Sequence, residues 1–236
     1  MPRRFGSVMI TTLSFDLDDT LWPIAPAIEA AEQALRDWLQ QHWPTVAKAW
    51  SAERMAELRD GLWQQHPELA HDFTRLRQLA IERMLQPAGG SAADVDAAFD
   101  VFYEARNRVQ FYPEARAVLD RLAGRYRLIA ISNGNACLRR TGLDAVFVTG
   151  IHARQVGVAK PDPAIFHHAC ATIGERPERV LHIGDHPRQD VEGALQAGLR
   201  AAWLDRDQRD WPERPDRVPR LRCLAELERW LDRIPS

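Results

Sequence analysis

Residues 8–20 read VMITTLSFDLDDT, and this stretch decides the fold. Mostly apolar and β-branched side chains fill residues 8–15, and the carboxylates of Asp16, Asp18 and Asp19 follow at once. A short apolar run of this kind predicts a buried β-strand that delivers polar residues to its carboxyl end. We therefore take residues 8–15 as a first strand and the acidic residues as the beginning of a functional loop.

The chain beyond residue 112 alternates between helical and extended patterns. In chain order we predict a helix from Glu114, a strand at 126–132, a short helix, a strand at 146–149, a helix from Pro163, a strand at 179–183, a helix from Gln189 and a strand at 200–204. Alternation of this kind implies a parallel sheet with helices on both faces. A surface loop over 205–221 is expected to lead to a last helix that ends near Trp230 and Leu231.

Between these two parts the sequence has helical periodicity and no strand pattern. The periodicity predicts about four helices over 26–110, with breaks at 43–44, 66–67 and 87–90. The predicted organisation is a Rossmann-like α/β core of residues 1–21 and 112–236, interrupted by an all-helical cap of residues 22–111. Insertions at the carboxyl end of a strand commonly serve as lids.

The composition is typical of a globular protein, with 45% hydrophobic residues, 27% charged residues and a formal net charge of -2 over 236 residues. No basic run points to nucleic acid or an anionic membrane, and no apolar run approaches the roughly 20 residues of a membrane helix. The first residues, MPRR, lead to no signal-peptide cleavage site. Three widely spaced cysteines predict no disulfide framework. We expect a cytoplasmic protein with a small-molecule partner, and the oligomeric state stays open.

Polar residues stand where the predicted strands end. They are Asp16 to Thr20 after the first strand, Ser132-Asn133-Gly134 after the second, and Gly184-Asp185 with Asp190 after the fourth. Carboxyl ends of parallel strands share one edge of the sheet, so these residues are expected to meet there. Each set alone is also typical of an ordinary turn, because turns favour Asp, Ser, Asn and Gly. A calcium loop is excluded, because Leu21 and Ala27 stand where the EF-hand needs Gly and Glu.

Lysine is rare in this sequence, since Lys48 and Lys160 are the only lysines among 31 basic residues. Lys160 precedes Asp162, a predicted helix N-cap, and Pro163, a predicted first helical residue. A lysine retained among so many arginines suggests that a compact ammonium is needed at this loop.

These motifs together resemble the haloacid dehalogenase-like hydrolase superfamily. The resemblance covers residues 15–21, residues 131–134, residues 160–163 and Gly184-Asp185 with Asp190, and the helical insertion resembles the C1-type cap of that superfamily. It implies the following roles: Asp16 as nucleophile, Asp18 as acid/base, Ser132 as phosphate ligand, Lys160 as the group that steadies the nucleophile, and Asp185 as metal ligand.

The chemistry of a phosphate monoester agrees with this assignment. The dianion needs an in-line nucleophile and positive charge on its phosphoryl oxygens. Asp16 can form an aspartyl phosphate, and an all-oxygen site of Asp16, Asp185 and the carbonyl of Asp18 favours Mg²⁺. Ser132 and backbone N–H groups near Asn133 and Gly134 are expected to donate to the phosphate. The predicted function is a Mg²⁺-dependent phosphatase.

Other functions on the same residues stay open. Haloacid dehalogenation is the nearest alternative, although dehalogenases of the family lack a carboxylate equivalent to Asp18 and need no metal. A phosphomutase would share every residue named above and differ in how its cap excludes water. A sugar-phosphate or nucleotide phosphatase is equally compatible with the core motifs, and a binding module without catalysis would usually lack one of the aspartates.

Substrate choice is expected to depend on the cap, because the core motifs recognise only the phosphate. Arg75, in the segment 71–77, is predicted to contact the leaving group, whereas Arg77 points elsewhere on the helix. Trp22, directly after the first motif, is predicted to stack on a flat ring. This region resembles bacterial superfamily members that dephosphorylate flavin mononucleotide. The roles of His186 and Asp190 stay open, with Asp190 able to support Lys160, hold a metal-bound water or cap a helix.

Overall fold

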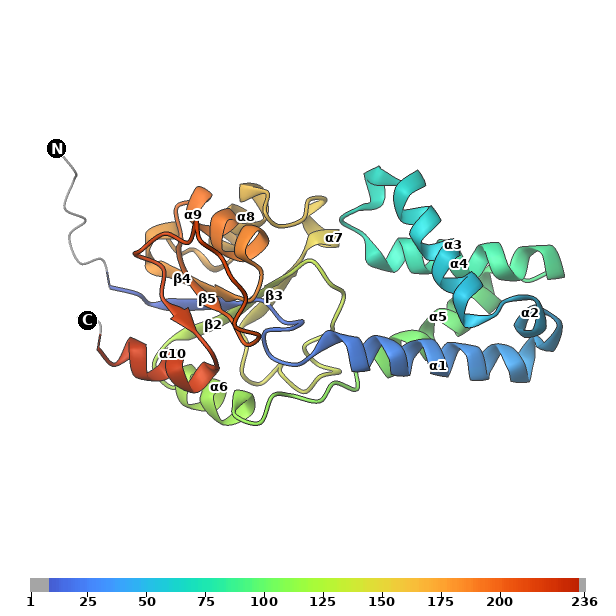
Figure 1. Ribbon diagram of the computed structural model, residues 1–236, viewed down its shortest axis with the longest axis horizontal. Helices are drawn as coiled ribbons and strands as arrows, with labels where there is room; N and C mark the ends of the chain where they lie inside the picture. Colours follow the sequence, from blue (N-terminus) through green and yellow to red (C-terminus); the bar gives the residue numbers. More distant parts are fainter. Residues whose placement is uncertain (1–8, 234–236) are drawn as a thin grey trace. The chain divides into compact units, whose positions relative to one another are not determined.

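The computed structural model describes residues 9–233, so residue 8 of the predicted first strand and the MPRR segment lie outside the described residues. The chain forms two compact units (Figure 1). The core unit comprises Met1–Pro23, Phe111–Gly134 and Gly142–Ser236, and the cap unit comprises Ile24–Gln110 and Asn135–Thr141.

A parallel sheet forms the centre of the core unit. Its strands are β1 (Thr12–Phe15), β2 (Arg127–Ser132), β3 (Thr149–His152), β4 (Val180–Gly184), β5 (Arg200–Leu204) and β6 (Arg220–Leu221). They are arranged in the order β3-β2-β1-β4-β5-β6, and every pairing is parallel. The predicted α/β class is therefore confirmed. The strand β1 lies between β2 and β4, where the strand order reverses, and ligands of such sheets bind beyond this point.

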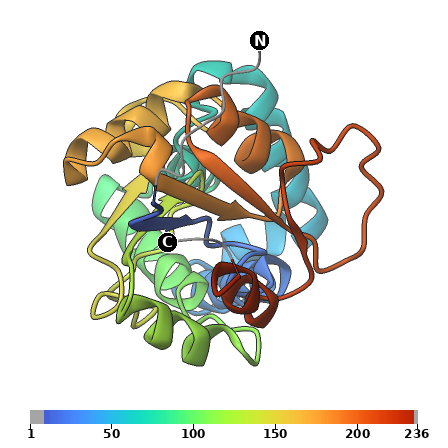
Figure 2. The same cartoon turned by 90° about the vertical axis from the view of Figure 1, so that its left-hand side faces the viewer.

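Helices cover both faces of this sheet (Figure 2). One face carries α6 (Ala115–Ala123) and α10 (Leu224–Leu231), and the other carries α8 (Pro163–Ile173) and α9 (Gly193–Gln196). The short α7 (Ala153–Val156) follows β3, the 3-10 turn η3 (Pro177–Arg179) precedes β4, and the π-helical turn η4 (Pro187–Glu192) follows it. Ile129 and Ile131 of β2 belong to a fully buried apolar cluster with Ile165 and Phe166 of α8. This packing fixes the strand ends that carry the polar residues.

Three predicted elements of the core differ from the structure. The strand expected at 146–149 begins only at Thr149, and turns replace the short helix expected before it. The apolar residues that suggested the earlier start have other roles, because Phe147 packs edge-on against Phe15 at 5.9 Å between ring centroids and Val148 is exposed. The loop expected at 205–221 ends in β6, which pairs with β5.

The cap unit contains five α-helices among its described residues. They are α1 (Ile24–His42), α2 (Pro44–Ala49), α3 (Ala52–Gln65), α4 (Phe73–Leu85) and α5 (Ala92–Arg106), with 3-10 turns at Pro67–Leu69 and Gln86–Ala88. Three helix starts use side-chain caps, from Ser51, Asp72 and Ser91. Breaks between helices occur at the three predicted places, and a further break at residues 50–51, which was not predicted, separates the short additional helix α2 from α3.

A short segment after β2 belongs to the cap unit although it lies outside residues 22–111. Arg106 donates from Nε to Asn135 Oδ1 at 3.0 Å, and Asn135 Nδ2 donates to Thr74 Oγ1 at 3.1 Å. The backbone N–H of Cys137 donates to Asn107 Oδ1 at 2.7 Å. These bonds anchor the segment to α4 and to the end of α5.

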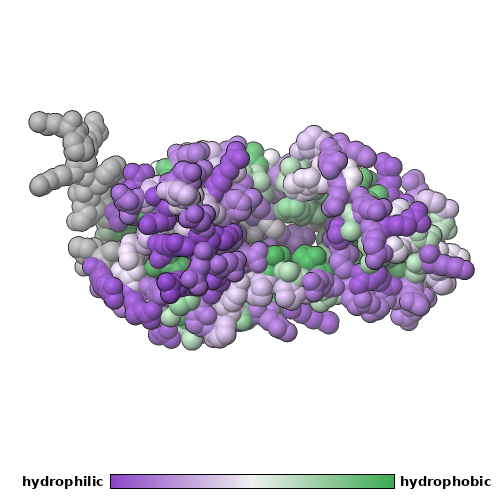
Figure 3. Space-filling view, in the orientation of Figure 1, coloured by the Kyte–Doolittle hydropathy of each residue, from purple (hydrophilic) through white to green (hydrophobic). Residues whose placement is uncertain are grey.

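The surface is polar over most of the face drawn in Figure 3, with hydrophobic residues in small patches on each unit. Within residues 9–233, no helix combines the length and the apolar character needed to cross a membrane.

Candidate active site

Asp16 is the first residue after β1, and its position is fixed by the sheet. Its backbone N–H donates to Ile183 O of the neighbouring β4 at 2.9 Å, which extends the parallel pairing by one residue. The chain then turns sharply, because Leu21 N–H donates to Leu17 O and Asp19 has a φ of 57°. Aspartate is one of the few residues that tolerates this left-handed conformation. The strand end and the turn therefore hold the Asp16 carboxylate at the edge of the sheet.

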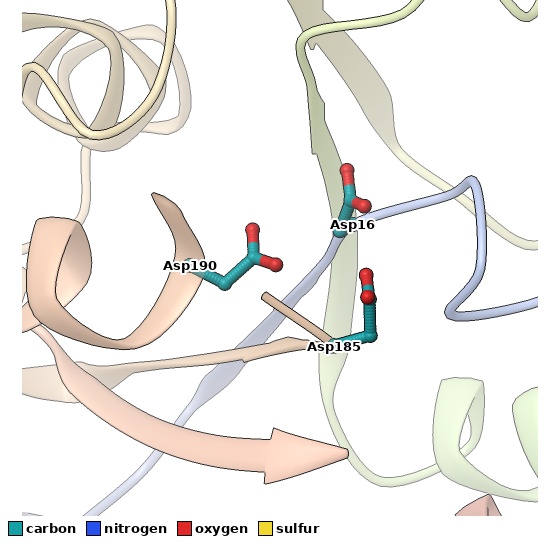
Figure 4. A group of neighbouring side chains, drawn as sticks. All are labelled: Asp16, Asp185 and Asp190. Atoms are coloured by element: carbon teal, nitrogen blue, oxygen red, sulfur yellow. The ribbon is translucent and has the colours of Figure 1, made fainter. Parts of the chain in front are cut away.

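Three carboxylates gather at this edge (Figure 4). Asp16 follows β1, Asp185 follows β4 and Asp190 lies on η4, and each offers an oxygen atom within 4.8 Å of the others. The side chains of Asp185 and Asp190 point toward Asp16. The prediction that these strand-end carboxylates come together follows from the topology, and the geometry agrees with it.

Lys160 lies within the same cluster and is 3% exposed. Its Nζ donates to Asp16 Oδ1 and to Asp190 Oδ1, both at 2.6 Å, and to Ile131 O at 2.9 Å. An ammonium has three N–H donors, so all three have partners. The predicted helix start beyond it is confirmed, because Asp162 accepts from Ala164 N–H and α8 begins at Pro163.

Asp190 is the second carboxylate that contacts Lys160. Besides Lys160, its Oδ1 accepts from His182 Nε2 at 3.2 Å, and its Oδ2 accepts from the His186 backbone N–H at 2.9 Å. A Cβ atom at Gly184 would lie 2.2 Å from Asp190 Cγ, so this carboxylate requires glycine there. Of the roles left open for Asp190, the contacts favour support of the lysine.

Charge and burial act against each other at this site. Burial raises the pKa of Asp16 well above its ordinary value, Lys160 opposes the rise, and Asp190 and Asp185 add to it. Burial alone would lower the pKa of Lys160, but Asp16 and Asp190 raise it above its ordinary value. The ammonium therefore stays charged and stabilises the ionised form of the carboxylates that it contacts.

Asp185 is held by two residues that do not contact Asp16, Asp190 or Lys160 in the hydrogen bonds described above. Arg209 Nη2 donates to Asp185 O at 2.6 Å and to Asp185 Oδ2 at 3.2 Å, and Trp203 Nε1 donates to Asp185 O at 2.8 Å. Burial and the nearby Asp190 carboxylate raise the pKa of Asp185 to about 6, although Arg209 opposes the shift. The sequence analysis missed Arg209, because it lies in the long loop before β6.

Asp18 is oriented by Trp22. The indole Nε1 donates to Asp18 Oδ1 at 2.8 Å, and the ring packs edge-on against Phe111 at 5.2 Å between ring centroids. Trp22 is 0% exposed. The ring therefore presents no open face for the stacking on substrate that the sequence suggested, and its N–H group instead fixes the direction of the Asp18 carboxylate.

The loop after β2 is held by hydrogen bonds within itself and to the loop that carries Lys160. Ser132 is buried, and its Oγ accepts from the Gly134 backbone N–H at 3.0 Å. The Asn133 side chain faces the lysine loop, where its Oδ1 accepts from the Lys160 backbone N–H at 2.7 Å and its Nδ2 donates to Lys160 O at 3.0 Å. Asn133 thus positions Lys160, a role that the sequence did not reveal, while Ser132 and Gly134 carry the polar groups suited to a phosphoryl oxygen.

Comparison with known proteins agrees with these motifs. A family model described as haloacid dehalogenase-like hydrolase matches residues 10–198. The Escherichia coli (strain K12) protein YigB, a 5-amino-6-(5-phospho-D-ribitylamino)uracil phosphatase, is 33% identical over 199 residues, which is 83% of each chain. This chain belongs to the haloacid dehalogenase-like hydrolase family. The family predicted from the motifs is confirmed.

Two further relatives show the range of the family. The phosphoserine phosphatase of Thermus thermophilus is 36% identical over 152 residues, which is 62% of this chain and 60% of that protein. The crystal structure of 2-haloacid dehalogenase from Pseudomonas syringae pv. Tomato DC3000 has a TM-score of 0.86 and 38% identity, covering 95% of this chain and 99% of that one. The curated relatives support an assignment of this hydrolase to the phosphoric monoester hydrolases.

The carboxylate cluster suits a magnesium ion. Its donors are all oxygens, and three buried or half-buried carboxylates face one fully paired lysine, so a cation would relieve their repulsion. Asp190 already accepts three N–H donors, which leaves Asp16 and Asp185 as the residues that would hold the ion. The Asp18 side chain is not a member of this cluster, and its predicted contribution is the backbone carbonyl.

The remaining predicted residues have local partners. Arg75 lies on α4 with its side chain about half exposed, pairs with Glu82 at 3.7 Å, and lines a cleft of the cap unit together with Ser91. Arg77 is buried against Phe102. His186 Nδ1 accepts from the Gln189 backbone N–H at 3.2 Å, which makes His186 the N-cap of η4.

We expect Asp185→Asn to stabilise the metal-free protein at about pH 8. An ionised carboxyl whose folded-state pKa is raised to about 6 destabilises the fold above that pH, by at most about 3 kcal/mol, and the penalty disappears as the pH falls toward about 4. Mg²⁺ should raise the Tm of the wild type and raise that of Asp185→Asn less. Thermal melts across this pH range, with and without Mg²⁺, measure both effects. Equal Mg²⁺-induced shifts in the two proteins would remove Asp185 from the metal site.

Proposed function

We propose that this hydrolase cleaves a small phosphate monoester through an aspartyl phosphate on Asp16, with Mg²⁺ as cofactor. The observation that carries the proposal is the 2.6 Å bond between Lys160 Nζ and Asp16 Oδ1 at the end of β1. The bond opposes the rise in the pKa of this buried carboxylate and so favours its ionised form, at the point of the sheet where ligands bind and next to a second carboxylate, Asp185.

In the first step Asp16 attacks phosphorus. Because Lys160 holds Oδ1, we assign the attack to Oδ2, and the bond between phosphorus and the ester oxygen breaks as the new P–O bond forms. The Ser132 hydroxyl and the Gly134 N–H are suited to donate to a phosphoryl oxygen, in place of the bond that they make with each other. Asp16 and Asp185 would hold Mg²⁺, and the bound ion would neutralise charge on the phosphoryl group.

Asp18 is assigned the proton transfers. It would give a proton to the departing alkoxide and then accept one from the water that hydrolyses the aspartyl phosphate. The indole N–H of Trp22 donates to Asp18 Oδ1 at 2.8 Å and holds this carboxylate in a defined direction. This arrangement supports an acid/base role because a fixed carboxylate is needed on the leaving-group side.

Dehalogenation of a 2-haloacid is the second candidate, favoured by the name of the 38% identical structure. In that reaction Asp16 would attack carbon, and halide would leave without a proton. Neither Asp18 held by Trp22 nor a carboxylate pair suited to Mg²⁺ is required for such a step. These two features support phosphate hydrolysis over dehalogenation.

A direct assay separates the two reactions. The purified protein is incubated with p-nitrophenyl phosphate, with Mg²⁺ or with EDTA, and separately with 2-chloropropionate while chloride release is followed. We expect phosphate release that depends on Mg²⁺ and no chloride release above the Asp16→Asn control. Chloride release without phosphate release would overturn the proposal.

For the substrate we propose a phosphate ester of a ribityl chain. The name of YigB specifies a ribitylamino-uracil phosphate, and flavin mononucleotide, the substrate suggested by the sequence, carries the same ribityl 5-phosphate. A ribityl chain offers hydroxyl groups, and the exposed guanidinium of Arg75 is suited to bind them or the ring carbonyls.

We expect a panel of phosphate esters to give the highest kcat/KM for the two ribityl phosphates, ahead of sugar phosphates and nucleotides. Arg75→Ala should raise KM for flavin mononucleotide about 10-fold, the effect of one polar contact, and leave p-nitrophenyl phosphate unchanged. Arg83→Ala, on the same helix and exposed, is the control. A preference for a sugar phosphate, or equal effects of Arg75→Ala on both substrates, would refute the ribityl assignment and leave the phosphatase proposal intact.

We propose the reducing cytoplasm as the compartment. The three cysteines, Cys137, Cys170 and Cys223, are free thiols. Burial raises the pKa of Cys170 to about 11, which keeps this thiol protonated and unreactive. Free cysteines of this kind are compatible with a compartment that keeps thiols reduced.

A further inference from the structure

A chain of polar side chains runs through the interior of the sheet behind Asp16. Ser14 of β1 and His182 of β4 are register partners, and both are 0% exposed. Ser14 Oγ lies 2.8 Å from His182 Nδ1, and His182 Nε2 lies 3.2 Å from Asp190 Oδ1. Buried polar side chains in the middle of a parallel sheet are unusual and need a compensating reason.

The partners fix the direction of these hydrogen bonds. Burial would raise the pKa of Asp190, but Lys160 and His182 lower it below its ordinary value, so the carboxylate is ionised and can only accept. His182 Nε2 therefore carries the hydrogen. A neutral imidazole then has Nδ1 as an acceptor, and the Ser14 hydroxyl donates to it. Burial lowers the pKa of His182, which agrees with a neutral ring.

The ring has little freedom to leave this position. Phe166 of α8 packs edge-on against it at 5.1 Å between ring centroids, and Ser14 holds its far nitrogen. The Nε2–H group is thus directed at Asp190 Oδ1, the oxygen that also accepts from Lys160.

Sharing this oxygen affects the bond between the lysine and the nucleophile. Lys160 Nζ lies at the same distance, 2.6 Å, from Asp190 Oδ1 and from Asp16 Oδ1. If Asp190 lost the donor from His182, its charge would be less compensated and would attract the ammonium more strongly. Lys160 would then stabilise Asp16 less.

We propose that His182 is a positioning residue, which together with Ser14 holds Asp190 so that Lys160 is shared equally with Asp16. The inference rests on the proposed function in that Asp16 is taken as the nucleophile. His182 acts through Asp190 and Lys160 and touches no substrate. Its effect should therefore appear in kcat and not in KM.

The kinetic test compares His182→Leu, which removes the donor at similar volume, with His182→Gln, whose amide retains an N–H donor. We expect kcat for p-nitrophenyl phosphate to fall about 10- to 100-fold in His182→Leu, with KM within about twofold of the wild-type value, and to recover largely in His182→Gln. Ser14→Ala should lower kcat by a smaller factor. His168→Leu, on the exposed side of α8, is the matched control. Equal losses of kcat in the Leu and Gln variants, or a change confined to KM, would overturn the proposal.

A spectroscopic test does not depend on activity. In protein labelled with ¹⁵N-histidine, two-bond ¹H–¹⁵N correlations report which ring nitrogen carries the hydrogen, and the missing signals of His182→Gln assign His182. We expect a neutral ring with hydrogen on Nε2 at neutral pH. An imidazolium, or hydrogen on Nδ1, would overturn the positioning role even if the enzyme is a phosphatase. If the protein hydrolyses no phosphate ester but His182 shows the expected tautomer, the proposed function is refuted and the hydrogen-bond chain is retained.

Discussion

Asp16→Asn is expected to lower phosphatase turnover by about 10⁴-fold or more and to leave the fold intact. The amide is a far weaker nucleophile than the carboxylate, so no aspartyl phosphate forms. Removing one of three crowded carboxylates also relieves repulsion from Asp185 and Asp190, and the metal-free variant should melt no lower than the wild type. Steady-state assays with p-nitrophenyl phosphate and a thermal melt measure the two effects.

The control for this variant is Asp144→Asn, which makes the same chemical change at an exposed position of the core unit. It should retain full activity. Mass spectrometry of acid-quenched wild-type enzyme during turnover should find a phosphoryl group on Asp16. A folded Asp16→Asn protein that still turns over would disprove covalent catalysis by this residue.

Asp18→Asn should slow hydrolysis of an alkyl phosphate by roughly 10²- to 10⁴-fold, the usual contribution of general acid/base catalysis. The loss should depend on the leaving group, because p-nitrophenolate departs without protonation and a ribityl alkoxide does not. With p-nitrophenyl phosphate the first step should therefore survive, whereas hydrolysis of the aspartyl phosphate still lacks its base. Rapid mixing should reveal a burst of p-nitrophenolate close to one equivalent per enzyme.

Asp19→Asn provides the matched control for Asp18→Asn. It removes the same charge from the adjacent residue, and asparagine tolerates the φ of 57° found there. Its activity should stay close to that of the wild type. If the Asp18→Asn enzyme hydrolysed both substrates at the full rate, the role of Asp18 would be limited to its backbone carbonyl.

The parts of the fold that the sequence predicted are those set by local patterns. The apolar run before Asp16, the N-cap at Asp162 and the breaks between cap helices all depend on neighbouring residues. The meeting of Asp16 with Asp185 was predictable for a second reason: parallel strands place their carboxyl ends at one edge, whatever the length of chain between them. The contact of Lys160 with Asp16 was implied only by the resemblance to the superfamily.

The missed features depend on partners far apart in the chain. The role of His182 was not predicted, because nothing near it in sequence shows that Ser14 lies opposite. Trp22 was predicted to stack on a flat ring, but its own ring is buried and packs against Phe111. The sequence did contain one signal of the contact between Ser14 and His182: a serine and a histidine within apolar strands require each other or another polar partner.

The segment Asn135–Thr141 has a consequence for protein engineering. The chain passes between the core and cap units at four places, two of which flank this segment. A chimera that exchanged only residues 22–111 with another family member would separate Asn135 from Thr74 and Arg106, and would leave a buried arginine without this acceptor. Recombination junctions that also exchange residues 135–141 keep these bonds, and they place the new junction directly after Gly134, in the loop that we propose binds the phosphate.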